Sequence, residues 1–245
     1  MNKDKNVIAI GGGGSEHNFS IYQYAVSLTK KKKPRALLIP TAAPGRDPTN
    51  IWNTFQECFG KKLNCQVDIL DLLFHQYTSK EIEKLVLEAD LIYVSGGNTL
   101  RMVTVLKNKG VAKLIEKAYR KGTVMMGESA GAICWHAFGH SDSRRELNPE
   151  NWKYICVSGF GYFQGIFCPH YTKVRGADFE KMLLRKKESG IALTDFAGIQ
   201  YQNDQFRILK SKPSGCAYLF KHLNNKIIKK RIISDGKFRH IRELF

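Results

Sequence analysis

Short apolar runs alternate with amphipathic stretches over the first half of the chain. The runs at 7–10, 36–39, 67–70, 91–94 and 123–126 are continuous, which is typical of strands buried on both faces. Between them, apolar residues recur with helical spacing at about 15–29, 48–59, 99–107 and 111–120, and Ser79 is expected to cap a further short helix. The alternation predicts an α/β fold, a mostly parallel sheet with helices on both faces.

The pattern changes after about residue 196. Short strand candidates at 199–201, 206–209, 217–220 and 232–233 are separated by turn residues such as Asn203-Asp204 and Asp235-Gly236. These are expected to be antiparallel strands near the C-terminus that extend the same domain. Because the chain contains no Gly/Ser/Pro linker and no repeat, we expect one domain over residues 1–245.

Three glycine-bearing turns follow predicted strands, at 11–14, 96–97 and 127–131. The carboxyl ends of parallel strands meet at one edge of a sheet, and ligands bind beyond that edge. The three turns are therefore expected to converge on one site.

Composition narrows the class of protein. With 43% hydrophobic residues among 245, the chain can bury a substantial core without a disulfide or metal. Six cysteines form no Cys-x-x-Cys pair and no zinc-binding spacing, so we expect reduced thiols and no metal. No apolar run is long enough to span a bilayer, and Met1–Lys5 lead into only four apolar residues, too few for a signal peptide. The expected location is cytoplasmic, with no membrane partner.

The formal net charge of +17 comes mostly from scattered lysine runs, including 30–33 and 229–230. No nucleic-acid-binding module accompanies them, so we interpret them as a solvated surface and expect no specific nucleic acid partner. The positive field still favours anionic substrates. A nucleic-acid role remains a hypothesis from charge alone.

The third glycine turn carries a candidate nucleophile. Gly127-Glu128-Ser129-Ala130-Gly131 follows a predicted strand and precedes a helix, which is the context of a nucleophile elbow. The following helix N-terminus would direct amide donors at a developing oxyanion. The alternative is a turn of small residues that only lets a helix pack closely on the sheet. Ser129 is the candidate nucleophile of a serine hydrolase.

A serine nucleophile needs a base and an orienting carboxylate. Of seven histidines, His170 follows an apolar strand candidate that would bring it to the same edge, and Pro169 restricts the backbone before it. Asp142 lies in a polar loop between Ser129 and His170, and Asp195 ends another apolar run as its rival. The side chain of Glu128 is expected to project elsewhere.

The residues resemble those of a known family. His170 follows Ser129 by only 41 residues, which is short for an α/β-hydrolase. The segments Ser95-Gly96-Gly97-Asn98-Thr99, Gly127–Ala132 and Cys168-Pro169-His170-Tyr171 resemble, in the expected order, three motifs of the peptidase E (aspartyl dipeptidase) family. That family includes cyanophycinases, and its fold is similar to class I glutamine amidotransferases.

The resemblance implies a serine dipeptidase that acts on short peptides without a cofactor. Ser129 would be the nucleophile, His170 the base and Asp142 the acid. The backbone amides of Gly97 and Ala130 would form the oxyanion hole. The residues expected to bind substrate are Asn98, Thr99 and Arg175, the last as the cation for an N-terminal aspartate.

One departure and several alternatives remain. Glu128 stands where tryptophan is expected in the dipeptidases, which indicates a divergent branch. A catalytically silent module that binds an anionic metabolite or partner is the alternative. A glutamine amidotransferase is disfavoured because serine replaces cysteine at the elbow and Cys134 lies too far along the helix. Cyanophycinase activity is less favoured than dipeptidase activity, and a homodimer is one alternative for the oligomeric state.

Overall fold

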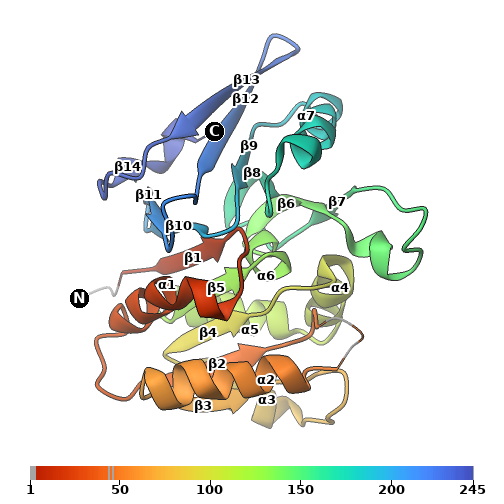
Figure 1. Ribbon diagram of the computed structural model, residues 1–245. Helices are drawn as coiled ribbons and strands as arrows, with labels where there is room; N and C mark the ends of the chain where they lie inside the picture. The colour runs from red at the N-terminus through yellow and green to blue at the C-terminus, as the bar shows by residue number, and fades with distance from the viewer. Residues whose placement is uncertain (1–3, 44, 46, 245) are drawn as a thin grey trace.

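Five apolar strands form the parallel part of the larger sheet in the computed structural model, which describes residues 4–43, 45 and 47–244. Their order is β1-β5-β4-β2-β3, and every neighbouring pair is parallel (Figure 1). The strands are β1 (Asn6–Ile10), β2 (Arg35–Ile39), β3 (Gln66–Ile69), β4 (Leu91–Val94) and β5 (Val124–Glu128). The predicted α/β class is confirmed.

Helices cover both faces of this sheet, as its continuous apolar strands require. Ile8 and Ile10 pack with residues of α1 (Ser15–Ser27), of α2 (Thr49–Phe55) and of the π-helical segment Gln56–Lys62 that continues α2. Val7 and Ala9, which point to the other face, pack in a cluster with α3 (Ser79–Glu88), α4 (Thr99–Asn108) and α5 (Val111–Arg120). The N-cap of α3 is Thr78 rather than Ser79.

Antiparallel strands extend the sheet beyond β1. β10 (Ala197–Gln202) pairs with β1, β11 (Gln205–Lys210) pairs with β10, and β14 (Arg239–His240) forms the edge. The two-residue turn Asn203-Asp204 joins β10 to β11, with φ of 54° at Asn203. This is the antiparallel extension that the C-terminal sequence predicts.

A second sheet of six strands was not predicted. Its order is β13-β12-β9-β8-β6-β7. Its strands are β6 (His136–Ser141), β7 (Ile155–Ser158), β8 (Phe163–Cys168), β9 (Gly190–Leu193), β12 (Ala217–Leu223) and β13 (Lys226–Ile232). α7 (Lys173–Lys186) packs its Phe179 and Leu183 against this sheet. Phe163 and Phe167 of β8 share one buried cluster with Ile199 of β10, so the core is continuous between the two sheets.

Helix length sets a limit on membrane insertion. None of the helices among the described residues is both long and apolar enough to cross a bilayer. Met1–Lys3, the first residues considered in the signal-peptide argument, lie outside the described part of the chain.

Candidate active site

Ser129 lies on a sharp turn between β5 and the short helix α6 (Ala130–Ile133). Its φ of 55° and ψ of −111° are strained for a residue with a side chain, as expected at a nucleophile elbow. A Cβ on Gly127 would overlap the Gly131 carbonyl, and a Cβ on Gly131 would overlap the Val94 carbonyl. Both glycines are therefore required because α6 packs directly on the strand ends.

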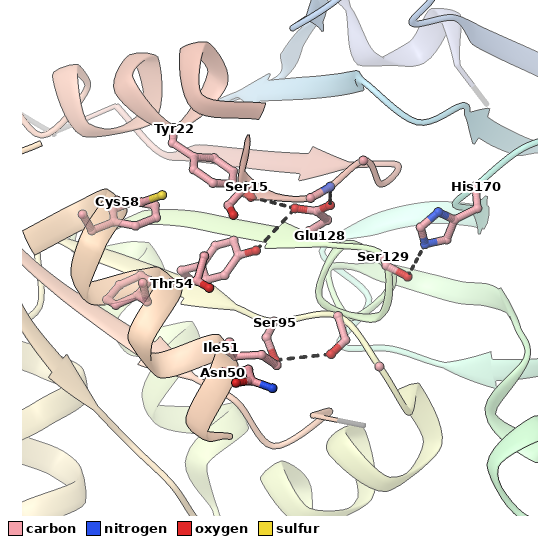
Figure 2. Close-up of a pocket in the computed structure, with 17 residues that line it drawn as sticks. Ser15, Tyr22, Asn50, Ile51, Thr54, Cys58, Ser95, Glu128, Ser129 and His170 are labelled. Carbon is pink, nitrogen blue, oxygen red and sulfur yellow. Dashed lines mark hydrogen bonds between the residues drawn. The ribbon is translucent and has the colours of Figure 1, made fainter. Parts of the chain in front are cut away.

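His170 lies against Ser129 from the second sheet. It follows β8 with φ of 48°, and its backbone N–H donates to the Gly11 carbonyl (3.1 Å), which fixes it beside the first glycine turn. Its Nε2 lies 2.8 Å from the Ser129 Oγ, and its Nδ1 lies 2.7 Å from Asp195 Oδ1 (Figure 2 shows the Ser129 contact). A carboxylate can only accept, so Nδ1 carries the proton and Nε2 is free to accept from the serine hydroxyl.

The carboxylate at His170 is Asp195, and the prediction that Asp142 orients this imidazole needs correction. Asp142 precedes a 3₁₀ turn at Ser143–Glu146 and makes no hydrogen bond to His170 among the described residues. β6 and β9 flank β8, and both lead to an aspartate. The chain after β8 turns towards β9, because the Tyr171 N–H donates to the Leu193 carbonyl (2.9 Å).

Asp195 is partly exposed, and the hydrogen bond from His170 lowers the pKa of its carboxyl. It is therefore ionised at neutral pH and can stabilise an imidazolium on His170.

The first glycine turn makes room for the His170–Asp195 pair. A Cβ on Gly12 would overlap both the imidazole ring and the carboxylate. The Gly12 carbonyl also accepts from the Phe196 N–H (3.0 Å), which ties this turn to the segment that carries Asp195. The sequence predicted that the glycine turns converge, but it did not indicate this role for Gly12.

The second glycine turn borders Ser129 on another side. A Cβ built on Gly96 would lie 3.3 Å from the Ser129 Cβ, so the Gly96-Gly97 backbone and the elbow are in close contact. Among the described residues, the backbone N–H groups of Gly97 and Ala130 have no hydrogen-bond acceptor. These are the two donors predicted for an oxyanion hole.

Asn98 and Thr99 connect α4 to the loop after β6, and neither is among the described residues that line the cavity at Ser129. The Asn98 side chain caps α4 by accepting from the Arg101 N–H (3.0 Å) and donates to the Ser143 carbonyl (3.1 Å). Thr99 is buried, and its Oγ1 accepts from the Ser141 hydroxyl (3.1 Å). Both polar groups are occupied by contacts inside the fold.

Arg175, predicted as a cation for substrate, is buried in the protein. It lies in the first turn of α7 and is 6% exposed. Its Nε donates to Nδ1 of His140 (3.2 Å) and its Nη2 to the His140 carbonyl (2.8 Å). The guanidinium therefore stabilises the second sheet and does not line the cavity at Ser129.

A cavity of about 440 Å³ opens beside Ser129, within the usual size range for small-ligand sites (Figure 2). Glu128 lines it, and its side chain points away from His170, as expected. Glu128 Oε1 accepts from the Gly14 N–H (2.8 Å), and Oε2 accepts from the Tyr22 hydroxyl (2.8 Å). Burial raises the pKa of Tyr22 well above its usual value, so this hydroxyl stays a donor at neutral pH.

Among the described residues, no group of three or more His, Cys, Asp or Glu side chains is arranged so that it could hold a metal ion.

The chain matches known peptidases over most of its length. The model of peptidase family S51 matches residues 7–209. An uncharacterized peptidase of Bacillus subtilis (strain 168), YgaJ, is 34% identical over 221 residues, covering 87% of this chain and 91% of that protein. An uncharacterized peptidase of Listeria monocytogenes serovar 1/2a, Lmo0363, is 36% identical over 99 residues, 39% of this chain and 45% of that protein.

Solved structures share the fold. The crystal structure of a peptidase from an acI-B1 actinobacterium superposes with a TM-score of 0.73 and 17% identity, covering 98% of both chains. A putative peptidase E protein from Listeria monocytogenes EGD-e superposes with a TM-score of 0.66 and 19% identity, covering 84% of this chain and 98% of the other.

Proposed function

The chain belongs to peptidase family S51, and from this premise we propose that it is a serine peptidase that hydrolyses short peptides through Ser129, His170 and Asp195. The observation that carries the proposal is the continuous hydrogen-bond chain from the Ser129 hydroxyl through His170 to Asp195, at 2.8 and 2.7 Å. A serine hydroxyl is a weak nucleophile at neutral pH, and this arrangement supplies the base that activates it.

The reaction begins when Ser129 Oγ attacks the carbonyl carbon of the scissile amide. His170 Nε2 takes the hydroxyl proton, and Asp195 stabilises the imidazolium that forms. We expect the negative charge on the carbonyl oxygen to be stabilised by the backbone N–H groups of Gly97 and Ala130, which have no acceptor among the described residues. His170 then gives its proton to the leaving amine, and a water molecule releases the acyl group by the same steps in reverse.

A fluorophosphonate probe tests the nucleophile directly. We expect the wild-type protein to form a covalent adduct at Ser129 and to hydrolyse dipeptides. The Ser129→Ala variant should form no adduct at this position, and its rate of hydrolysis should be at least a thousandfold lower. Ser158→Ala changes an exposed serine at the end of β7 and is the matched control, which should behave as wild type. Hydrolysis by Ser129→Ala at the wild-type rate would disprove the proposal. A folded wild-type protein with neither adduct nor hydrolysis would favour the silent binding module.

We also place this peptidase in the cytoplasm. All six cysteines are unpaired in the structure, which supports a reducing compartment. Cell fractionation with antibodies against the native chain would test this location, and recovery in the membrane or secreted fraction would contradict it.

A further inference from the structure

The cavity beside Ser129 is walled largely by aromatic and aliphatic side chains. Phe55 and Phe59 stack with ring centroids 4.5 Å apart, and Tyr22 stacks on Phe59 at 5.3 Å. Ile51 and Cys58 complete this wall, which comes from α1, α2 and the π-helical segment. Such a surface gains free energy by covering an apolar group. The polar side chains that also line the cavity, Ser15, Asn50, Thr54 and Ser95, are uncharged and cannot balance a buried charge.

The charge in this cavity is negative. Glu128 precedes the nucleophile in the chain, is 8% exposed, and is held in place by the Gly14 N–H and the Tyr22 hydroxyl. The residues that line the cavity in the described part of the chain include no lysine or arginine. Arg175, the cation expected from the sequence, is buried against His140 instead. A second carboxylate in the cavity would face Glu128 without a described cation to balance it.

The side of Ser129 on which the cavity lies indicates which part of a peptide enters it. Figure 2 places Glu128, Tyr22 and Cys58 on the side of Ser129 opposite to His170. The leaving amine must lie near His170, because His170 donates the proton that it takes up. The cavity therefore lies on the acyl side of the scissile bond.

Resting on the proposed peptidase function, we propose that this cavity binds the side chain of the residue on the N-terminal side of the scissile bond. It takes uncharged apolar and aromatic side chains, such as those of methionine and phenylalanine. Glu128 is the residue that excludes aspartate and glutamate. The protein is then a peptidase for apolar N-terminal residues and not an aspartyl dipeptidase.

Isosteric substrates isolate the charge effect. Asp-Leu and Asn-Leu have nearly the same shape and differ by one charge, so their kcat/KM ratio reports the repulsion from Glu128. Two carboxylates about 5 Å apart at an effective dielectric of about 20 predict a preference for Asn-Leu of about a hundredfold or more. Met-Leu and Phe-Leu should be cleaved better than either.

Glu128→Gln is the first test, since it keeps the shape of the side chain and removes its charge. We expect the preference for Asn-Leu over Asp-Leu to fall to within a few-fold. Glu116→Gln is the matched control: Glu116 is a partly exposed carboxylate on α5 that pairs with Arg120, and the ratio should not change. Thermal unfolding and fluorophosphonate labelling of Ser129 establish that the Glu128→Gln protein is folded and has a reactive nucleophile.

Thr54→Arg is a second test that leaves the hydrogen bonds of Glu128 intact. Thr54 is exposed and lines the cavity, so arginine there introduces a cation without entering the core. We expect cleavage of Asp-Leu to rise about tenfold relative to Asn-Leu. Wild-type protein that cleaves Asp-Leu as well as Met-Leu would overturn this inference and leave the proposed function intact. Failure to cleave every peptide, together with no Ser129 adduct, would overturn both.

Discussion

Replacing Asp195 by asparagine tests the catalytic arrangement most directly. The substitution keeps the size of the side chain, but it removes the negative charge of the carboxylate whose Oδ1 accepts from His170 Nδ1 at 2.7 Å. An asparagine amide can instead donate to Nδ1. His170 would then carry its proton on Nε2, the atom that must accept from the Ser129 hydroxyl.

The size of the effect follows from two contributions. An imidazolium and a carboxylate about 4 Å apart attract by about 4 kcal/mol at an effective dielectric of about 20. Because the His170 and Asp195 side chains are 40% and 46% exposed, solvent screening reduces this to about 2 kcal/mol, or about 30-fold in rate. Reversal of the tautomer adds to the loss, and the equivalent change in a serine protease costs about 10⁴. We expect kcat to fall by about 10² to 10⁴.

The assay is steady-state hydrolysis of Met-Leu by wild type, Asp195→Asn and Asp142→Asn, with thermal unfolding of each. Asp142→Asn is the matched control because its carboxylate does not contact His170, and its kcat should stay within about threefold of wild type. Loss of activity in Asp142→Asn with Asp195→Asn near wild type would refute the assignment.

Three further predictions concern packing, capping and pH. Gly12→Ala should lower kcat at least a hundredfold, because a Cβ on Gly12 overlaps His170 and Asp195. Gly198→Ala is the control and should lose little kcat, because its Cβ would meet no atom closer than 3.5 Å. Thr78→Ala removes the capping box of α3 and should lower the free energy of unfolding in urea by about 1 kcal/mol, with unchanged kcat/KM. Burial lowers the pKa of His140 from 6.5 to about 4, so the unfolded chain binds the extra proton between these values. The contribution of His140 to the free energy of unfolding should therefore fall by about 3 kcal/mol from pH 7 to pH 4, and an equal stability at both would contradict this.

Local patterns in the sequence were sufficient to locate the parallel strands of the larger sheet. The runs at 7–10, 36–39 and 91–94 correspond to β1, β2 and β4, because a strand buried on both faces must be apolar at every position. The second sheet was not predicted. Its strands β12 and β13 have the same turn-separated pattern as β10 and β11, and periodicity does not say which sheet a strand joins.

At the site, too, the sequence determined one part and the tertiary structure another, and the meeting of the glycine turns belongs to the first part. Strand ends followed by glycine predicted that three turns would meet, and residues of all three turns line the cavity at Ser129. This much follows from the sequence because the direction of parallel strands determines which turns share an edge.

Only the tertiary structure decided which charged groups reach the site. Asp142 and Asp195 both follow strands that flank β8, and a backbone hydrogen bond from Tyr171 to Leu193 brings the His170 segment to Asp195. Arg175 is buried against His140, and Glu128 lines the cavity. A nucleophile elbow needs small residues at fixed positions around the nucleophile, and these residues can be read directly from the sequence. The position of a side-chain charge depends on contacts between segments far apart in the chain, which folding alone brings together.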